Sequence, residues 1–435
     1  MKLIELDEKK FDHYVKNHPE KSHFLQSAAW GKFSYKMRNL KPFYLGLVDK
    51  DEKIIGATLL LRKSLPLGLC YFYAPRGFVI DYKDKSLIKN MTKEVVIFAK
   101  KHHAIFVKID PDIIYRKENY LEEEQQLDYD SKKIINTLKE IGFKHLGFTK
   151  NFETTQPRYT FRIDLNQSMK EIEEHFSKTT KQRISKAQKL KTEVTIGDEK
   201  GIHEFYKLMR LTEARKDFVS HTEDYYQNLY KIFNEDNKAT LFLGKVNLDK
   251  VIEEGKKRLK KIISEIESMP TENLSKSAKT KLNELTKQKE KEKEEIEKYK
   301  AAKEKYGKEL ILNAHWIMEY GDKAWVLYAG NHNILTETYA NYHTYYEHIK
   351  YCKEKGLKIY DQFGTIGDLR KDNPRLGLHE FKKKFGGDYV EFIGEFDYVT
   401  NHLMYFVFTR LVPFYRNIVK KRAKKEAYHE ASRNK

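Results

Sequence analysis

Three consecutive lysines, Lys382 to Lys384, stand between Phe381 and Phe385 in the segment LGLHEFKKKFGGDY. Lysines along a solvated helix are ordinary, because an ammonium group is strongly hydrated. A lysine held between aromatic rings, late in an αβ-patterned region, would instead place one ammonium in a cleft. Such a positive charge can stabilise negative charge that develops during a reaction. Both interpretations stay open at this point.

Charged residues also follow several predicted strands. Arg76 lies in YAPRGFVIDY (73–82) and Asp110 in KIDPDI (108–113), each directly after a β-patterned run. Arginine–aspartate pairs at strand ends commonly tie loops together, so a structural role stays open beside a functional one. Similar motifs are QPRYTFRIDL (156–165), LTEARKDF (211–218), YAGNHN (328–333) and FIGEFDYV (392–399).

Several reaction types lack their sequence signatures. The chain has no Walker loop, no glycine triplet that opens a helix after a strand, and no Gly-x-Ser-x-Gly elbow. The acetyl-CoA pyrophosphate signature and histidine pairs at metal-ligand spacing are also missing. The two cysteines, Cys70 and Cys352, lie in aromatic-rich apolar segments and are predicted to be buried free thiols. We therefore expect neither a metal nor a cofactor.

Composition indicates a globular protein with an anionic partner. The chain has 435 residues, of which 40% are hydrophobic and 13% aromatic, enough for two or three domains. Lysine and arginine total 83 against 64 acidic residues, a net charge of +19. This excess favours nucleic acid, phospholipid headgroups or phosphorylated substrates.

Hydrophobic segments that would enter or cross a membrane are not found in the sequence. The N-terminus lacks an apolar run long enough for a signal peptide, and no segment reaches the roughly 18 to 20 apolar residues of a spanning helix. We expect a protein that is cytoplasmic or lies on the cytoplasmic side of a membrane.

The elements that must position these residues are predicted to form one αβ unit that occurs twice. In the first copy, strands YLGLV, IIGATLLL and CYFYAPRG precede the helix KSLIKNMTKEVVIFAKKH and the strand AIFVKID. In the second copy, LFLGKV, ILNAHWIMEYG and AWVLYAGNH precede the helix ETYANYHTYYEHIKYCKEKG and the strand KIYDQFG. The repeat predicts an internal duplication of a mixed αβ unit.

In the second copy, a charged insert of about 60 residues, 247–306, replaces the short turn between the first two strands. Its apolar residues recur at spacings of three, four and seven on both sides of Pro270, which predicts an antiparallel helical hairpin. The seam consists of Ile252, Leu259, Ile262, Ile266, Met269, Ala278, Leu282, Leu285, Ile296, Tyr299 and Tyr306. Lys289 and Glu292 interrupt the seam. The hairpin is either a solvated coiled coil or a contact for RNA.

The motifs, taken in order, resemble the Fem/MurM (FemABX) family of peptidyltransferases that build peptidoglycan cross-bridges, and most of all its MurM and FemX branches. The resemblance covers nearly the whole chain. It rests on QSAAW (26–30), SLPLG (64–68), PRG-x-x-x-DY (75–82), IDPDI, QPR, SKTTKQRISKAQ (177–188), YAG, F-K-x-K-F and IGEFDYV.

The resemblance implies an α/β (α+β) fold of tandem GNAT-like (acyl-CoA N-acyltransferase) domains. The first domain is expected over residues 1–155, completed by about 388–410, and the second over 156–246 and 307–387. The hairpin occupies 247–306, and a basic amphipathic tail occupies 402–435.

The resemblance also implies a reaction. Family members move an amino acid, here glycine, alanine or serine, from aminoacyl-tRNA to the ε-amino group of the stem-peptide lysine of a peptidoglycan precursor. In these branches the acceptor is usually lipid II, with UDP-MurNAc-pentapeptide as the soluble alternative. The tRNA ester is already activated, so the reaction needs no ATP or metal.

By resemblance, two residues are candidates for catalysis. Lys382 would stabilise the oxyanion and contact the tRNA acceptor end, with Phe381 packed beside it. Asp110 would orient the attacking amine or accept its proton. The neighbouring Lys383 would face solvent or phosphate and is a candidate for tRNA binding.

The resemblance further implies residues that bind the precursor. Arg215 would pair with its phosphate, although a salt bridge with Glu213 or Asp217 is an alternative; Arg76 is a further candidate. Relatives carry a lysine four residues after the tryptophan of the QSAAW-like motif, where this chain has Ser34. Lys32 and Lys36 are the candidates to replace it.

Two basic segments are candidates for polyanion binding. The stretch 177–191 would bind tRNA through Lys178, Lys181, Arg183 and Lys186, or would be a plain solvated helix without an apolar face. The C-terminal HLMYFVFTRLVPFYRNIVKKRAKK is aromatic and then basic. It would lie on the inner face of the cell membrane, or dock on the protein's own surface.

The sequence leaves two alternatives to cross-bridge synthesis. The same chemistry would serve an immunity factor that alters cross-bridges against a bacteriolytic endopeptidase. A non-catalytic RNA- or membrane-binding protein would use the basic segments alone.

Overall fold

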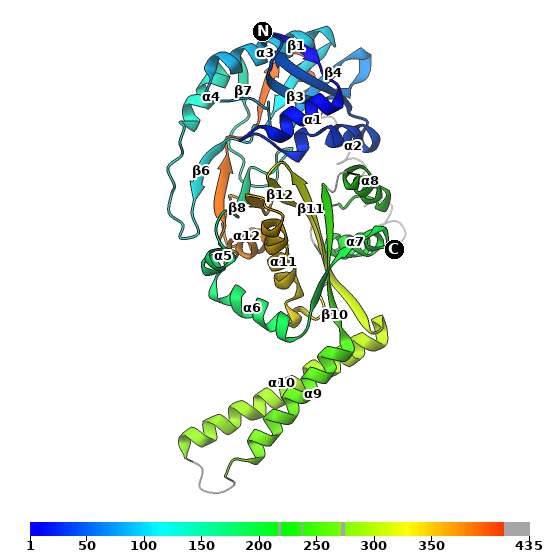
Figure 1. The fold of residues 1–435 in the computed structure, drawn as a ribbon, viewed down its shortest axis with the longest axis vertical. Helices are drawn as coiled ribbons and strands as arrows, with labels where there is room; N and C mark the ends of the chain where they lie inside the picture. The colour runs from blue at the N-terminus through cyan, green and yellow to red at the C-terminus, as the bar shows by residue number, and fades with distance from the viewer. Residues whose placement is uncertain (216–218, 236–237, 271–274, 413–435) are drawn as a thin grey trace, which may run out of the picture.

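The computed structural model describes residues 1–215, 219–235, 238–270 and 275–412. These residues form a seven-stranded and an eight-stranded sheet that follow one another along the long axis of the molecule (Figure 1). A helical hairpin projects from the far end of the second sheet, away from the first.

The seven-stranded sheet is built mostly from the N-terminal part of the chain. Its strands, in spatial order, are β1 (Lys2–Glu5), β2 (Lys41–Val48), β3 (Ile54–Ser64), β4 (Cys70–Ala74), β5 (Ala104–Ile109), β15 (Phe396–Val399) and β7 (Phe143–His145).

The eight-stranded sheet takes its strands mainly from the later part. In spatial order they are β6 (Ile114–Glu118), β14 (Asp388–Phe392), β8 (Tyr159–Asp164), β13 (Ile359–Asp361), β12 (Lys323–Asn331), β11 (Glu309–Tyr320), β10 (Ala239–Asn247) and β9 (Glu193–Gly197).

Helices cover both sheets. Those that begin before the hairpin are α1 (Glu8–Asn17), α2 (Ala28–Arg38), α3 (Lys85–Lys101), α4 (Ser131–Glu140), α5 (Met169–His175), α6 (Lys178–Lys189), α7 (Glu199–Glu213) and α8 (Glu223–Asn234). The hairpin is α9 (Leu248–Glu267) and α10 (Lys276–Tyr306), and the later helices are α11 (Ala340–Glu354), α12 (Leu376–Lys383) and α13 (His402–Phe406).

The predicted duplication is confirmed by the strand pairing. β2, β3 and β4 pair antiparallel in succession, and β4 then pairs parallel with β5 across the crossover helix α3. β10, β11, β12 and β13 repeat this pattern, with α11 as the crossover. Both parallel pairs therefore end at equivalent places, where loops can carry functional residues.

The two sheets exchange strands in a way that the predicted boundaries did not include. β6, from the N-terminal segment, pairs with β14 in the second sheet. The segment expected to complete the first domain from about residue 388 is divided, because β14 pairs with β8 in the second sheet whereas β15 pairs with β5 and β7 in the first. The chain thus crosses between the sheets more than once.

One apolar core joins the two units. The Phe24 ring, just before α2, lies 5.2 Å from the Trp325 ring of β12, and the Trp30 ring lies 6.3 Å from the Phe233 ring of α8. Aromatic side chains contribute large buried areas, so this contact holds the sheets together. Cys70 and Cys352 are buried free thiols, as predicted.

The predicted hairpin is present, and its base belongs to a core of the second unit. Ile252, Ile296 and Tyr299 are buried together with Leu335 and Ala340 next to α11. Glu292 interrupts the apolar seam. Its negative charge is paired with Arg258 of α9 at 2.6 Å. The ion pair lets the two helices stay together beyond the apolar base.

We predict that Tyr299→Ala lowers the free energy of unfolding by about 3–5 kcal/mol, because the buried ring leaves a cavity at the hairpin base. Tyr306→Ala is the matched control, since that ring is 37% exposed, and it should cost less than about 1 kcal/mol. Urea unfolding followed by circular dichroism measures both. Equal losses in the two variants would contradict this role of the hairpin base.

Candidate functional site

Asp110 and Arg76, both predicted from the sequence, lie together where the parallel strands β4 and β5 end. Arg76 has a φ of +59° and Gly77 a φ of +78°, and a Cβ on Gly77 would lie 2.9 Å from the Cα of Pro111. This tight turn directs the Arg76 backbone N–H to Asp110 Oδ1 at 2.6 Å. A non-glycine residue in the left-handed region is strained, and such strain clusters at functional sites.

The Asp110 carboxyl is buried and hydrogen-bonded. The Tyr73 hydroxyl donates to its Oδ2 at 2.9 Å. Burial raises the pKa of Asp110 to about 7, against the opposing effect of the Arg76 guanidinium. A carboxyl with a pKa near neutrality can take up and release a proton at physiological pH, as a general base must.

The Arg76 side chain extends toward the second unit. Its Nη2 donates to the Pro157 carbonyl at 3.2 Å, and its guanidinium lies 4.7 Å from the centre of the Phe392 ring. The Arg162 guanidinium lies 5.0 Å from the same ring. The Phe392 ring of β14 therefore contacts both guanidinium groups, and the contacts are of the cation–π type.

Arg162 of β8 bridges the two units. It stands opposite Asp361 in the antiparallel pair of β8 and β13, and its Nε donates to Asp361 Oδ2 at 2.8 Å. Its Nη2 donates to both carboxylate oxygens of Asp112, which follows β5, at 3.0 and 2.9 Å. Burial disfavours the ionised form of Asp112, but Arg162 and nearby cations outweigh it and hold the pKa of Asp112 below its ordinary value.

Lys382 is buried at the end of α12. Its Nζ donates to the backbone carbonyls of Gln362, Phe363 and Gly364, each at 2.7 Å. These carbonyls follow β13 directly and use all three donors that an ammonium has. Burial lowers the pKa of Lys382 to about 7, with the Asp361 carboxylate opposing the shift. The ammonium thus lies in a carbonyl cage rather than on the surface.

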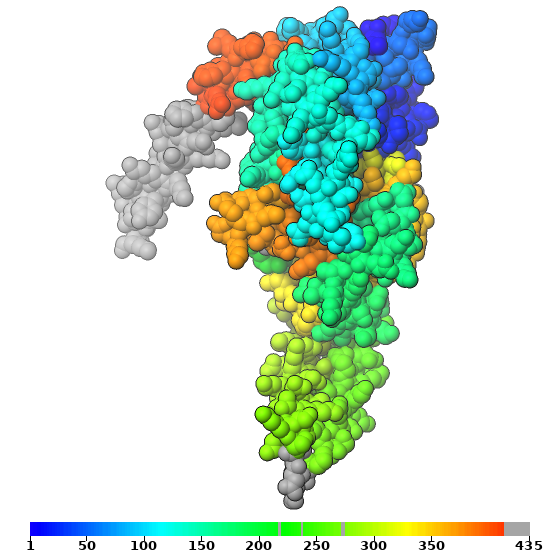
Figure 2. All heavy atoms as spheres, turned by 90° about the vertical axis from the view of Figure 1, so that its left-hand side faces the viewer, coloured from blue at the N-terminus to red at the C-terminus, as the bar shows by residue number. Residues whose placement is uncertain are grey.

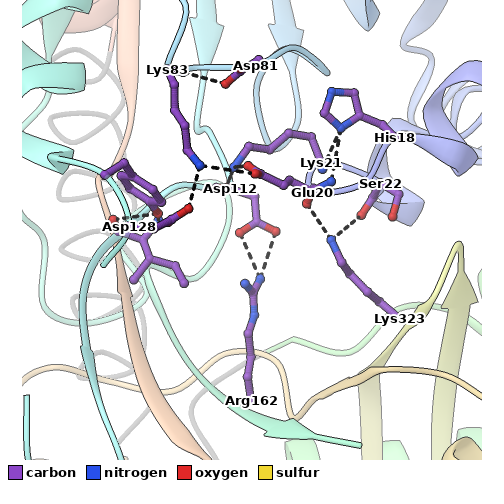
Figure 3. Close-up of polar contacts among 12 residues, drawn as sticks. His18, Glu20, Lys21, Ser22, Asp81, Lys83, Asp112, Asp128, Arg162 and Lys323 are labelled. Carbon is purple, nitrogen blue, oxygen red and sulfur yellow. Dashed lines mark hydrogen bonds and ion pairs between the residues drawn. The ribbon is translucent and has the colours of Figure 1, made fainter. Parts of the chain in front are cut away.

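A pocket of about 550 Å³ lies beside this network, between the two units. Figure 3 shows Lys21 and Glu20 from the first unit and Arg162 and Lys323 from the second around Asp112. The Lys323 Nζ donates to the carbonyls of Glu20 and Ser22 at 2.7 and 3.3 Å, and the Lys21 Nζ donates to that of Asp112 at 3.1 Å.

These contacts connect the two predicted catalytic residues. Arg76 links Asp110 to Phe392, Arg162 links Phe392 to Asp361, and the residues after Asp361 hold Lys382. Most of these contacts are shielded from solvent. Charges in the network therefore interact in surroundings of low dielectric constant.

Other predicted residues lie apart from this network. Phe381 packs its ring on Tyr342 and Tyr345 of α11 at 5.0 and 4.9 Å, so it supports α12. Lys383 is on the surface and pairs with Glu122 at 2.7 Å. Arg215 follows α7, is exposed, and donates to the Asn331 carbonyl at the end of β12 at 2.6 Å.

Lys32 and Lys36 do not take the place of Ser34. Ser34 is fully buried on the inner face of α2, whereas both lysines are exposed. Residues two apart on a helix point in roughly opposite directions, which explains the difference. Lys32 pairs with Glu8 at 2.6 Å. Both lysines therefore face solvent on α2, whereas Ser34 faces the core.

The basic segment forms α6, which has an apolar face that the sequence analysis missed. Thr180, Ile184 and Ala187 are buried against the second unit. Lys178 and Lys181 are exposed on α6, as polyanion binding requires. The guanidinium of Arg183 and the ammonium of Lys186 instead lie over the rings of Tyr342 and Tyr339 of the second unit.

The central residues Asp112, Arg162 and Asp361 were not predicted, nor were Lys21 and Lys323. Arg162 interrupts the apolar pattern of YTFRIDL, and Asp112 follows the strand end already singled out in IDPDI. Those were available signals, since a buried charge needs a partner. No sequence signal marks Lys21 or Lys323, because many of the chain's lysines occupy similar local sequences.

Comparisons with known proteins agree with this architecture. The family model described as the FemAB family matches residues 6–412. The chain belongs to the FemAB family. It is 31% identical to a lipid II:glycine glycyltransferase of Staphylococcus haemolyticus, over 95% of this chain and 96% of the relative, and 29% identical to that of Staphylococcus aureus, with the same coverage.

A crystal structure of FemX superposes with a TM-score of 0.74 at 28% identity, covering 93% of this chain and 99% of that one. The tandem GNAT-like fold implied by the family resemblance is thereby confirmed. The duplicated β2–β5 and β10–β13 units are the two halves of that tandem.

We predict that Arg162→Met lowers the free energy of unfolding at pH 7 by about 3–5 kcal/mol, because it leaves two buried carboxylates unpaired. The ionised form of Asp112 stabilises the fold fully above the ordinary aspartate pKa near 4, so the loss should persist down to about pH 4 and shrink as the pH falls below it. Urea unfolding at several pH values measures the effect.

Arg116→Met is the control, since Arg116 is 43% exposed and pairs with Glu118 at 3.1 Å on the surface. It should change the free energy of unfolding by less than about 1 kcal/mol. A pH-independent loss in Arg162→Met would show that the ion pairs are not its cause.

Proposed function

We propose that this protein transfers glycine from glycyl-tRNA to the ε-amino group of the stem-peptide lysine in lipid II. The observation that carries the proposal is similarity over nearly the full length to lipid II:glycine glycyltransferases. The choice of glycine and of a lipid-linked acceptor follows those relatives. The net charge of +19 suits two polyanionic substrates.

The reaction is aminolysis of an ester. The amine nitrogen attacks the aminoacyl carbonyl carbon, negative charge develops on the carbonyl oxygen, and the bond to the tRNA ribose oxygen then breaks. The ribose hydroxyl leaves with a proton, and the amine loses one. The protein must therefore accept a proton from the amine and stabilise the oxyanion.

Asp110 is the proposed proton acceptor. Its carboxyl, with a pKa near 7, accepts a hydrogen bond from Tyr73, and the strained Arg76 turn holds it in place. When the pKa of a base is close to the working pH, a large fraction of the base is deprotonated and it still binds a proton well.

Lys382 is the proposed source of positive charge for the oxyanion. Its three carbonyl contacts mean that a direct bond to the oxyanion requires one carbonyl to be released. Without that release, the ammonium still acts through its field in a dry environment and keeps the loop after β13 in place.

The remaining predicted residues fit substrate binding at the surface. Arg215 is exposed at the end of α7, where a phosphate of the acceptor can reach it. Lys178 and Lys181 of α6 are exposed and suited to tRNA phosphates, and Lys383 is suited in the same way after release from Glu122. Lys32 and Lys36 lie on the exposed face of α2.

We further infer a contact with the membrane surface through residues 402–411. Leu403, Phe406 and Leu411 are 69%, 54% and 48% exposed, while Phe408 and Tyr405 pack on Tyr71 and Phe106 of the first sheet. The segment stands out from the body at the upper left of Figure 2. Residues 413–435, where the predicted basic tail continues, lie outside the described residues. No described helix has the length and apolarity to cross a membrane.

The transfer assay is the direct test of the proposed function. Purified full-length protein, glycyl-tRNA and lipid II should yield lipid II with glycine on the stem-peptide lysine, detected by mass spectrometry. Alanyl- and seryl-tRNA should react more slowly. No product with any of the three donors would refute the function.

Lys382→Met should lower the transfer rate about 100-fold, with tRNA binding retained, because the developing oxyanion loses a buried cation. Lys384→Met is the matched control from the same lysine triplet and should keep the rate within about twofold. Single-turnover transfer and filter binding measure the two properties. An unchanged rate in folded Lys382→Met would exclude the proposed role.

The pH profile of transfer should be bell-shaped with a maximum near 7. Activity rises as Asp110 loses its proton at a pKa of about 7 and falls as Lys382 loses its charge at a pKa of about 7. Lys382→Arg should remove the falling limb, because arginine keeps its charge. A wild-type profile that is flat between pH 6 and 8, by kcat/KM, would contradict both assignments.

Replacing Leu403 and Phe406 together by serine should weaken binding to vesicles containing anionic lipid about tenfold or more, because two apolar side chains no longer enter the interface. Leu67→Ser is the control, since Leu67 is 90% exposed but lies in a different loop. Vesicle sedimentation measures binding. Equal binding by the double variant and the wild type would exclude this surface.

A further inference from the structure

The pocket between the units has a cationic floor whose hydrogen-bond capacity is only partly used. An ammonium has three donors. Lys323 is 5% exposed and uses two of them on the Glu20 and Ser22 carbonyls. Within the described residues no carboxylate lies within 4.0 Å of its Nζ. Burial lowers the pKa of Lys323 to about 8, so an anion in contact with it would be favoured.

Lys21 presents a second ammonium to the same space. Its side chain is 10% exposed, its Nζ donates to the Asp112 carbonyl at 3.1 Å, and the Glu20 carboxylate is 3.8 Å away. Figure 3 shows Lys21 and Lys323 near Asp112, with the Lys323 ammonium bonded to the backbone of Glu20 and Ser22. Buried ammonium groups with unused donors are uncommon, because an unsatisfied charge is costly.

Among the described residues, the unpaired positive charge of the floor lies at Lys323, because Lys21 and Arg162 each have a carboxylate partner within 4.0 Å. Lys21, Lys323 and Arg162 provide three cations against the carboxylates of Glu20, Asp112 and Asp361. A phosphate dianion would bring two negative charges to a floor that has one cation without a carboxylate partner. The rim carboxylates are already paired with lysines, Asp388 with Lys117, Asp322 with Lys358, and Asp128 with Lys83.

We propose that this pocket binds the carboxylate end of a short peptide, with the carboxylate on the free donors of Lys21 and Lys323. At about 550 Å³ the pocket is of the size that holds small organic ligands. Its apolar lining includes Ile114, Ile163, Ile359 and Val390, which suit small side chains. A rim carboxylate can accept the amino group of the peptide in place of its lysine partner.

Two sources offer this chemistry: a free dipeptide, or the terminal carboxylate of the acceptor's own stem peptide. The second source rests on the proposed function. It would place the end of the acceptor beside Arg162 and Asp361, whose following residues hold Lys382. The site would then bind the end of the stem peptide, at a distance from the lysine whose amino group reacts.

Isothermal titration of the full-length protein tests the pocket without the reaction. Alanyl-alanine should bind saturably to the wild type, and its C-terminal amide about tenfold more weakly, because the charge-assisted hydrogen bonds are lost. Lys323→Met should bind the free acid about tenfold more weakly. Lys358→Met, at the exposed rim, should bind within about twofold of the wild type. Lys21→Met replaces Lys323→Met if the latter does not fold.

Three results would overturn the site: no saturable binding by the wild type, equal affinity for acid and amide, or undiminished binding by folded Lys323→Met. Stronger binding of inorganic phosphate than of the dipeptide would do so as well. A raised KM for lipid II in Lys323→Met, with kcat unchanged, identifies the stem peptide as the source. An unchanged KM with lost dipeptide binding identifies a free peptide. Titration is independent of transfer, so a failure of the proposed function leaves this test intact.

Discussion

The structure depends on one buried guanidinium, that of Arg162, which is shared between Asp112 of the first unit and Asp361 of the second. Each carboxylate would be costly to bury alone, and the bidentate geometry toward Asp112 makes the pair directional. Apolar contacts between the units, such as that of Phe24 with Trp325, bury surface but do little to fix the orientation of one unit relative to the other. The ion pairs determine how the end of β5 faces the end of β13.

That orientation has chemical consequences, because it places two groups with altered acidity in one network. Burial raises the pKa of Asp110 and lowers that of Lys382, so both approach neutrality from opposite sides. Such opposed shifts are typical of sites that both accept a proton and stabilise negative charge. Asp110 follows β5 of the first parallel strand pair, and the carbonyls that hold Lys382 follow β13 of the second, so each unit contributes one group.

Much of the fold and part of the candidate site could be predicted from the sequence. The repeated strand–strand–strand–helix–strand pattern predicted the duplication, and the heptad spacing predicted the hairpin, because both are local patterns that survive packing. Asp110 and Arg76 were singled out because functional residues gather at strand ends, and the structure places the two residues in contact. For Lys382 the sequence left a solvated and a cleft position open; its carbonyl cage depends on a loop about 20 residues earlier, and no local pattern encodes it.

What the sequence could not provide was long-range pairing. β14 lies in the second sheet and β15 in the first, although only Ile393 to Glu395 separate them. Ser34 is buried, whereas Lys32 and Lys36 face solvent, which follows from the phase of α2. The pocket at Lys21, Asp112, Arg162 and Lys323 joins segments that are far apart in sequence, and Lys21 and Lys323 are ordinary in their own segments.

The central claim is that Asp110 and Lys382 act as parts of one reaction centre. A double-mutant cycle on the single-turnover transfer rate, with Asp110→Asn, Lys382→Met and the double variant, measures their coupling. If the two residues act together, the double variant should be about as slow as the slower single variant. Two independent losses that multiply in the double variant would contradict the claim.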